Sequence, residues 1–575
     1  APPLPEAPPL PPLPSSVEHA SSTSAAVTSA SRLIEKTLAQ LDPWRRCTIS
    51  ARRRTHVNSP PEKPGPKLDL TAADLEQYIR VLEELIDTRA HLAKLPLDDR
   101  NRLLAAAGRV SRPHRLEQKL LARALRKHNK KALRQADEAV LERASIRKKR
   151  EQPVFITPKR DALAAEAADE APEMDLALAG SELKKPRVCY VCKQLFAKVH
   201  FFYDQMCQTC GDFNHMKRSQ TAELGGRVAL ITGARVKIGY QAAILLLRAG
   251  ARVIVTTRFP HDASLRFAQE ADAPKWSDRL QIYGLDLRHT PSVEVFARHL
   301  NDTESRLDFV LHNACQTVRR PPGFYAHLMQ AEREPLAALP PPAQRLLERH
   351  SALSGAGSMT SVHQTSADAG ARVGLHQSSN LSQIPLVDED LDAGIQLFPS
   401  GKLDADLQQV DLREVNSWRL ALHEVSTVEL LEVQLVNAIA PFVLNARLKP
   451  LMLRQASDDK HIVNVSAMEG QFYRRFKTNK HPHTNMAKAA LNMMTRTSAD
   501  DYVKDGIHMN SVDTGWVTDE DPAHIAQRKT VEQGFHPPLD IVDGAARIVD
   551  PILDGINTGE HMWGQFLKDY KPAPW

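Results

Sequence analysis

The sequence lacks a long apolar run and contains few cysteines. Its best membrane-spanning candidate, AAILLLRAGARVIV, is interrupted by Arg248 and Arg252, so no stretch of about 18 apolar residues occurs and we expect no transmembrane span. Only six cysteines are present, and four of them fall in one short cluster. That distribution excludes a disulfide framework spread along a secreted chain and favours a reducing compartment.

The first 66 residues show no signal-peptide pattern. They open on the polyproline-type tract APPLPEAPPLPPLP and are rich in Pro, Ser and Arg, with too few apolar residues to bury a core. We expect residues 1–66 to be a disordered tail of a cytoplasmic protein. Residues 15–56 also have the Ser, Ala and Arg bias of an organellar transit peptide, so a mitochondrion or plastid is the alternative.

Residues 67–150 are predicted to form a basic helical region. Leu75, Ile79 and Leu82 recur at helical spacing, and residues 101–150 hold 16 Lys and Arg against four Asp and Glu. This charge suits an acidic protein partner or nucleic acid, but almost no aromatic side chains are present to stack on bases, so nucleic acid is disfavoured. A solvated charged face is the simplest interpretation. Residues 151–180 predict a polar linker.

A C-x2-C, fourteen-residue gap, C-x2-C array falls within residues 181–222. Two pairs of thiolates joined by a short loop supply four soft ligands in the tetrahedral arrangement of a closed structural zinc site, which iron also fits. The array predicts a small zinc ribbon with four cysteine ligands ahead of the main domain, and two redox dithiols are the alternative. The predicted ligands are Cys189, Cys192, Cys207 and Cys210.

Residues 223–575 alternate short β-branched runs with stretches of helical length. The runs RVALITG, ARVIVTT, LQIYGLD, LDFVLHNA, HIVNVSA and IHMNSVD predict buried parallel strands. The alternation indicates an α/β fold with a Rossmann-type doubly wound parallel sheet. Residues 320–405 are polar and rich in helix breakers, and we interpret them as a low-complexity insertion, disordered in part.

The segment ALITGARVKIGYQAAILLLRAGARVIVTTR predicts a dinucleotide-binding strand, turn, helix and strand. A pyrophosphate would lie at the helix N-terminus, after the turn that contains Gly233 and Gly239. The second strand ends at Arg258, whose guanidinium suits a 2′-phosphate, so NADP(H) is expected over NAD(H). Arg235 and Lys237 add positive charge near the phosphates.

These motifs resemble the short-chain dehydrogenase/reductase family over residues 225–575, less the insertion. Thr232 to Gly239 resembles TGxxxGIG with Lys237 at the middle glycine, LHNAC resembles NNAG, and MNSVDTGWVT resembles the loop that usually reads VNxVxPG. The resemblance implies hydride transfer with a small-molecule substrate and a homodimer or tetramer. It implies these cofactor-binding residues: Thr232, Gly233, Arg235, Lys237, Ile238, Gly239, Arg258, Asp286, Leu287, Asn313, Ala314, Lys488 and Gly515.

The predicted catalytic residues depart from that family pattern. Asn437 and Lys488 match its helix asparagine and its lysine, but Thr484 replaces the tyrosine and Ala467 the serine, with Ser466 one residue early. A threonine hydroxyl is far too weak an acid to replace a phenol. Enoyl reductases of the same superfamily place the tyrosine seven residues before the lysine, where this chain has His481. Tyr473 and His483 are the other candidate proton donors.

Two functions are consistent with this sequence. The first is an NADP-dependent oxidoreductase that reduces a carbonyl or an activated alkene with a non-standard proton donor. The second is a catalytically inactive dinucleotide-binding scaffold, which would account for the loss of Tyr and Ser and for the additional segments. The preserved set of cofactor-facing residues favours the enzyme.

Overall fold

The computed structural model describes residues 70–158, 182–354, 370–391, 396–473 and 477–575. The predicted disordered tail and most of the predicted linker lie outside these ranges. The described residues fall into two compact units, which are divided between Pro113 and His114. In the first, helix α2 (Ala72–Asp87) begins at Thr71, whose hydroxyl and Asp74 form a capping box. The 3-10 helix η1 (Arg89–Lys94) and helix α3 (Leu97–Ser111) follow.

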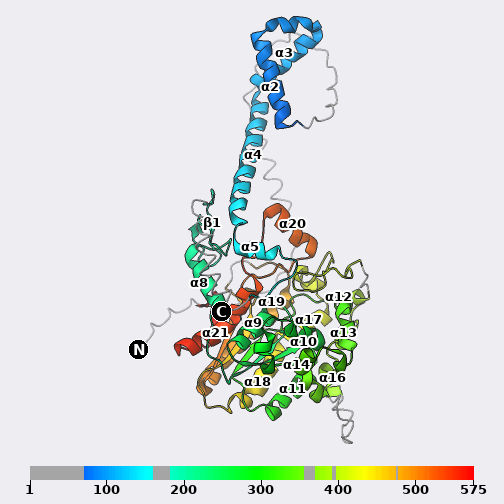
Figure 1. Cartoon of the computed structure of the whole chain (residues 1–575), viewed down its shortest axis with the longest axis vertical. Coiled ribbons are helices and arrows are strands. Elements are labelled where there is room, and N and C mark those ends of the chain that lie inside the picture. The colour runs from blue at the N-terminus through cyan, green and yellow to red at the C-terminus, as the bar shows by residue number, and fades with distance from the viewer. Residues whose placement is uncertain (1–69, 159–181, 355–369, 392–395, 474–476) are drawn as a thin grey trace, which may run out of the picture. The chain divides into compact units, whose positions relative to one another are not determined.

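The second unit is built on an eight-stranded sheet in the order β10-β9-β8-β7-β6-β3-β4-β5. Figure 1 labels the helices that surround this sheet. All six predicted strands are present and parallel, which confirms the predicted fold class. Two short strands at the C-terminal edge were not predicted, and β10 pairs antiparallel with β9. The strands are β3 (Val228–Thr232), β4 (Arg252–Thr257), β5 (Leu280–Gly284), β6 (Phe309–His312), β7 (Lys460–Ser466), β8 (Ile507–Asp513), β9 (Phe566–Lys568) and β10 (Lys571–Ala573).

Helices cover both faces of the sheet, and alternate strand residues pack into a hydrophobic core on each face. Ala229 and Ile231 of β3 pack in one core, whereas Val228 and Leu230 pack in the other, because successive strand side chains point to opposite faces. The first core includes helices α9 (Lys237–Arg248), α10 (Pro260–Ala268), α14 (Pro341–Ser354) and α21 (Ile541–Thr558). The second includes α11 (Thr290–Thr303), α18 (Ala440–Met452) and α19 (Pro482–Tyr502).

The predicted insertion, residues 320–405, is more ordered in its described part than a low-complexity loop. It contains α12 (Pro322–Tyr325), α13 (Met329–Arg333), α14 and α16 (Val373–His376). Leu339, Ala343, Leu346 and Leu347 are buried in the first core. The helical spacing of Ala343, Leu346 and Leu347 gives α14 an apolar face. The breaker-rich flanks obscured this face in the sequence. Residues 355–369 and 392–395, where disorder was also predicted, lie outside the described residues.

One helical stretch, Thr427–Met452, is long and apolar enough to cross a membrane, with a mean hydropathy of 1.5. It comprises α17 (Thr427–Gln434), a π-helical turn η11 (Leu435–Ile439) and α18. Half of the apolar window is buried, and Leu444, Leu448 and Leu451 pack on the sheet. Core helices of this kind pass the same test of length and composition.

The cysteine-containing segment packs against the end of the sheet domain. Strands β1 (Arg187–Val188) and β2 (Leu195–Phe196) and helix α8 (Gln208–Ser219) form it, and α8 lies beside α21. Arg218 of α8 is 1% exposed and contacts Asp540 at 2.6 Å and Asp543 at 2.9 Å. Burial raises the pKa of Asp540, but the Arg218 guanidinium outweighs that effect, so the pKa falls to about 2. This segment also packs against α5 (Ser145–Arg150) and the end of α4 (Arg115–Leu141).

We expect Arg218→Ala to destabilise the protein by about 3–5 kcal/mol, because it leaves two buried carboxylates without their cation. The measurement is urea denaturation at pH 7. Arg447→Ala is the matched control, since it removes an exposed ion pair with Glu294 and should leave the unfolding midpoint unchanged. Equal midpoints for the two variants would contradict the buried contact.

Candidate functional site

The turn between β3 and α9 has the close packing that its glycines predict. Gly233 has a φ of +69°, and a Cβ there would lie 2.7 Å from the Cα of Ala314. A Cβ at Gly239 would lie 2.2 Å from Nδ2 of Asn313, which donates to the Gly233 carbonyl at 2.9 Å. No side chain caps the N-terminus of the 12-residue helix α9. Its free N–H groups can therefore donate to an anion.

A cavity of about 370 Å³ opens at this turn, at the carboxyl ends of β3, β4 and β6. Ligands of doubly wound sheets bind at such an edge. The cavity brings together ten of the thirteen predicted cofactor residues: Gly233, Arg235, Lys237, Ile238, Gly239, Arg258, Asp286, Leu287, Asn313 and Ala314. Thr232 lies beneath them and accepts a hydrogen bond from the Ala314 amide at 3.1 Å. Lys488 and Gly515 are not among the lining residues.

The charged residues of the cavity differ in how far neighbours neutralise them. Arg258 donates to the Tyr325 hydroxyl at 2.7 Å, and no carboxylate of the described residues forms an ion pair with it. Arg235, by contrast, is paired with Asp262 at 2.7 Å. Asp286 is paired with Arg288 at 2.6 Å. Arg258 is thus better placed than Arg235 to meet an anionic group, and its partner Tyr325 was not predicted.

Asn437 and Lys488 are both buried, but neither lines the cavity. Asn437 lies in the π-helical turn η11, a kind of helix irregularity that is frequent at functional sites. Its side chain accepts from the backbone amide of Gln316 at 2.8 Å and donates to the carbonyl of Gln316 at 3.2 Å. The Lys488 ammonium donates to the Val465 carbonyl at 2.7 Å. Asn437 therefore holds the backbone of Gln316, which lines the cavity, whereas Lys488 holds the end of β7.

The predicted proton donors differ sharply in environment. His481 begins α19 with a φ of +43° and stacks on Trp418 at a centroid distance of 3.8 Å. Burial, with a further contribution from His483, lowers the pKa of His481 to about 4. Tyr473 is 51% exposed. Thr484, at the family's tyrosine position, is 3% exposed, and its hydroxyl has no partner among the described atoms.

His483 has the strongest acid–base partner of the three candidate donors. It is 1% exposed, and its Nε2 lies 3.3 Å from Oε1 of Glu429 on α17. Burial raises the pKa of Glu429, but its contact with His483 and further hydrogen bonds bring the pKa below the ordinary value. The two groups are in polar contact at this distance, but their geometry is not that of a hydrogen bond. The sequence carried no signal that linked two residues 54 positions apart.

Ser466 does not replace the missing serine at the cavity. It ends β7 and donates to Oδ1 of Asn492 at 2.6 Å. Asn492 is four residues beyond Lys488 on α19, so this hydrogen bond holds the strand and the helix together.

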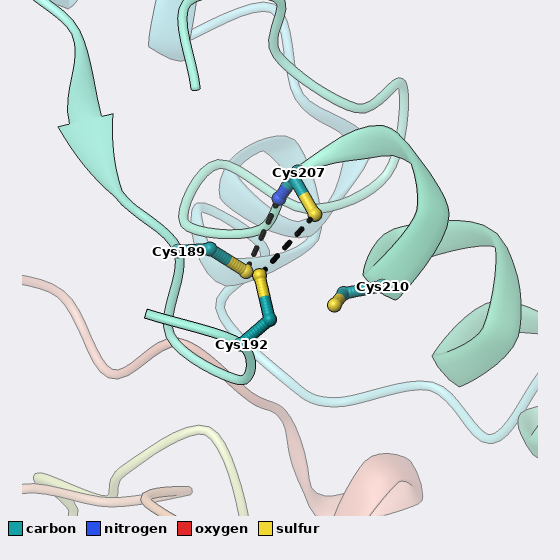
Figure 2. A group of neighbouring side chains, drawn as sticks. All are labelled: Cys189, Cys192, Cys207 and Cys210. Carbon is teal, nitrogen blue, oxygen red and sulfur yellow. Dashed lines mark hydrogen bonds between the residues drawn. The ribbon is translucent and has the colours of Figure 1, made fainter. Parts of the chain in front are cut away.

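The four predicted metal ligands converge on one point (Figure 2). Their Sγ atoms all lie within 4.8 Å of one another, and those of Cys192 and Cys207 are 3.8 Å apart. A tetrahedral zinc site with Zn–S bonds of about 2.3 Å requires sulfurs roughly 3.8 Å apart. A backbone hydrogen bond from Gln194 lowers the pKa of Cys192 to about 7, whereas burial raises the pKa of Cys207.

Comparisons with known proteins agree with this architecture. A short chain dehydrogenase model matches residues 227–331, and an enoyl-(acyl carrier protein) reductase model matches residues 415–538. Uncharacterized protein R665 of Acanthamoeba polyphaga mimivirus is 31% identical over 378 residues, which are 64% of this chain and 71% of that protein. Retinol dehydrogenase 11 of Mus musculus is 31% identical over 19% of this chain and 36% of its own length.

Solved structures of short-chain dehydrogenases also align with the chain. One from Burkholderia multivorans, with bound NADP, is 16% identical and covers 61% of this chain and 99% of its own, at a TM-score of 0.35. One from Escherichia coli, complexed with NADPH, is 18% identical over 61% of this chain and 98% of its own, also at a TM-score of 0.35.

We expect His481 to titrate near pH 4 in the folded protein, and Trp418→Ala to move its pKa toward 6.5 because the ring becomes hydrated. NMR of the imidazole signal, assigned with His481→Gln, measures this pKa. As the pH falls, the unfolded protein binds a proton at His481 near pH 6.5 and the folded protein only near pH 4. The free energy of unfolding should therefore decrease between about pH 6.5 and 4. A His481 midpoint near 6.5 in the unaltered protein would contradict the stacked, buried position.

Proposed function

We propose that this chain, which belongs to the short-chain dehydrogenase/reductase family, is an NADP(H)-dependent oxidoreductase that transfers hydride to a carbonyl or an activated alkene. The observation that carries the proposal is the cavity at the β3–α9 turn, where ten predicted cofactor residues meet. A nicotinamide cofactor bound there would supply the hydride. The uncapped N-terminus of α9 would hold its pyrophosphate.

The preference for NADP(H) over NAD(H) rests on Arg258. Its guanidinium forms no ion pair with a carboxylate of the described residues, and the Tyr325 hydroxyl at 2.7 Å holds it at the cavity wall. A 2′-phosphate would supply an anion for it through charge-assisted hydrogen bonds. Arg235 contributes less, because it is already paired with Asp262, a carboxylate that it shares with Arg266.

We assign the proton-donor role to His483 rather than to His481 or Tyr473. A pKa near 4 leaves His481 neutral at pH 7, where it is a poor acid. His483 has a carboxylate beside its ring, because Oε1 of Glu429 lies 3.3 Å from its Nε2. His483 directly precedes Thr484, the position of the family's tyrosine. In this proposal Asn437 holds the backbone of Gln316 at the cavity wall, and Lys488 holds the backbone of Val465 at the end of β7.

A second function has its own support. None of Asn437, Tyr473, His481, Thr484 and Lys488 lines the cofactor cavity, and the proposed donor His483 does not line it either. The Lys488 ammonium already has a backbone acceptor, Val465. These observations favour a catalytically inactive dinucleotide-binding scaffold, in which the cofactor stabilises the fold and other surfaces bind a partner. The basic helix α4 and the exposed apolar side chains of α2 are available for a protein partner in this case.

We further propose that the four cysteines hold a structural zinc, with iron as the alternative. The fit rests on sulfur separations close to those of a tetrahedral site. Four thiol donors would also fill the coordination sphere and leave no position for a reactive water. A cation at their centre would stabilise all four thiolates against mutual repulsion. The metal would brace the ribbon and take no part in hydride transfer.

Self-association through the long helices is part of the same proposal. Leu431, Ile439 and Phe442 on the α17–α18 stretch and Met486 and Met493 on α19 are 41% to 59% exposed. Apolar side chains grouped on neighbouring helices are typical of an oligomer interface. A homodimer or tetramer would cover them. We place the protein in the cytoplasm, with a mitochondrion or plastid as the alternative.

The decisive test is an NADPH titration of the full chain by fluorescence and calorimetry, followed by a panel of enones and ketones. The enzyme proposal predicts micromolar binding and oxidation of NADPH. His483→Gln should reduce turnover about a hundredfold or more by removing the general acid, whereas Thr484→Ala should retain turnover. NADPH binding without oxidation across the panel would instead support the scaffold, and unchanged turnover in His483→Gln would remove that residue from the mechanism.

We expect Arg258→Gln to weaken NADPH binding about tenfold or more and to leave NADH binding nearly unchanged, because only NADPH carries the 2′-phosphate. Arg320→Gln is the matched control. It also lines the cavity, but its charge is already paired with Asp411. Calorimetric dissociation constants for both nucleotides measure the effect, and a parallel loss for NADPH and NADH would refute the assignment of Arg258.

A further inference from the structure

The loop after β8 is held by the cysteine ribbon. The backbone amide of Trp516 donates to the hydroxyl of Tyr190 at 3.0 Å. Tyr190 lies between the predicted metal ligands Cys189 and Cys192, and its own amide donates to the Gln205 carbonyl at 2.8 Å. The position of the Tyr190 hydroxyl is therefore set by the fold of the ribbon.

The packing around Gly515 leaves this loop little freedom. Gly515 has a φ of +76°, and a Cβ there would lie 2.4 Å from Cδ1 of Leu539 and 3.1 Å from Oη of Tyr190. Leu539 is fully buried in the hydrophobic core of the ribbon, and its amide donates to the Trp516 carbonyl at 3.3 Å. Only glycine fits this contact.

The far end of the same loop forms part of the cofactor cavity. Val517 and Thr518 line the cavity, and Val517 also packs against the ribbon core. A Cβ on Gly544 of α21 would lie 3.2 Å from Val517 and 2.8 Å from Ile238 in the dinucleotide turn. A displacement of residues 514–518 would therefore change the wall of the cavity.

We propose that Tyr190 is a positioning residue for the dinucleotide, because it fixes the loop of residues 514–518 against the metal-bound ribbon. This inference rests on the proposed NADP(H) binding and adds that metal occupancy controls nucleotide affinity. Without a metal, Cys189 and Cys192 lose the bonds that order the turn between them, and small metal sites commonly lose their fold in that state. Tyr190 then loses its fixed position, and the amide of Trp516 loses its acceptor.

The experiment uses the full chain, purified without chelator and checked for one zinc or iron per chain. The NADPH dissociation constant and the hydrogen exchange of the amides of residues 514–518 are measured for the unaltered protein before and after chelation, and for Tyr190→Phe. Tyr502→Phe is the matched control. It removes a buried hydroxyl that donates to the Asn445 carbonyl at 3.1 Å, away from the ribbon.

We expect Tyr190→Phe to weaken NADPH binding about three- to tenfold, the net contribution of one hydrogen bond, with metal content unchanged. Chelation should weaken binding at least as much, and added zinc should restore it. Both changes should accelerate exchange at Trp516. Tyr502→Phe should alter neither the dissociation constant nor the exchange.

Failure of this inference is distinguishable from failure of the proposed function. If the metal-loaded protein binds no NADPH, the proposed function fails, and the exchange of the Trp516 amide alone tests the coupling. Unchanged protection of that amide after chelation and in Tyr190→Phe overturns the inference, as does equal NADPH affinity in all three states. If Tyr190→Phe does not fold, the NADPH dissociation constant and the exchange of the Trp516 amide in the chelated protein test the inference.

Discussion

The buried contact of Arg218 with Asp540 and Asp543 joins the ribbon to the sheet domain, and the rest of the site depends on it. Asp540 and Asp543 lie at the start of α21. Ile541, which follows Asp540, lines the cofactor cavity. Tyr203 of the ribbon donates to Asp543 at 2.5 Å, which adds a second polar contact inside the same interface. A buried cation with two carboxylates is costly to separate, because each partner would remain desolvated and unpaired. The ribbon is therefore an integral part of the domain that contains the cavity.

The two halves of the expected reductase site have diverged to different degrees. The cofactor half keeps the glycine turn, the uncapped helix and an available guanidinium, all of which act through backbone shape and charge. The proton-transfer half has lost its phenol. What remains is a buried contact between His483 of α19 and Glu429 of α17. Binding of a dinucleotide and transfer of a proton are separate physical demands, so one half can persist while the other changes. In the proposed enzyme, proton transfer would require His483 to reach a substrate, whereas nucleotide binding would not.

Features encoded by local sequence pattern were predictable, and features set by distant contacts were not. Alternating β-branched runs indicated all six parallel strands, and the cysteine spacing indicated four converging thiols. The edge strands β9 and β10 are three residues each, too short for a periodic signal. His481 was a reasonable donor by spacing alone, but its stacking on Trp418, 63 positions away, depresses its pKa by burial. The contacts of Arg258 with Tyr325 and of Tyr190 with Trp516 likewise join segments that no sequence pattern connects.

Lys237 shows how a local conflict in the sequence can indicate function. It has a φ of +57°, a left-handed conformation that costs a non-glycine residue roughly 1–2 kcal/mol, at the position where the family has glycine. A glycine would remove that strain but would also remove a cation from the wall of the cavity. Arg235, its neighbour on the turn, is paired with Asp262, whereas Lys237 forms no ion pair with a described residue. A strained lysine beside an uncapped helix N-terminus is the expected arrangement if the cavity binds an anion, and a scaffold that bound no nucleotide would gain nothing from the strain.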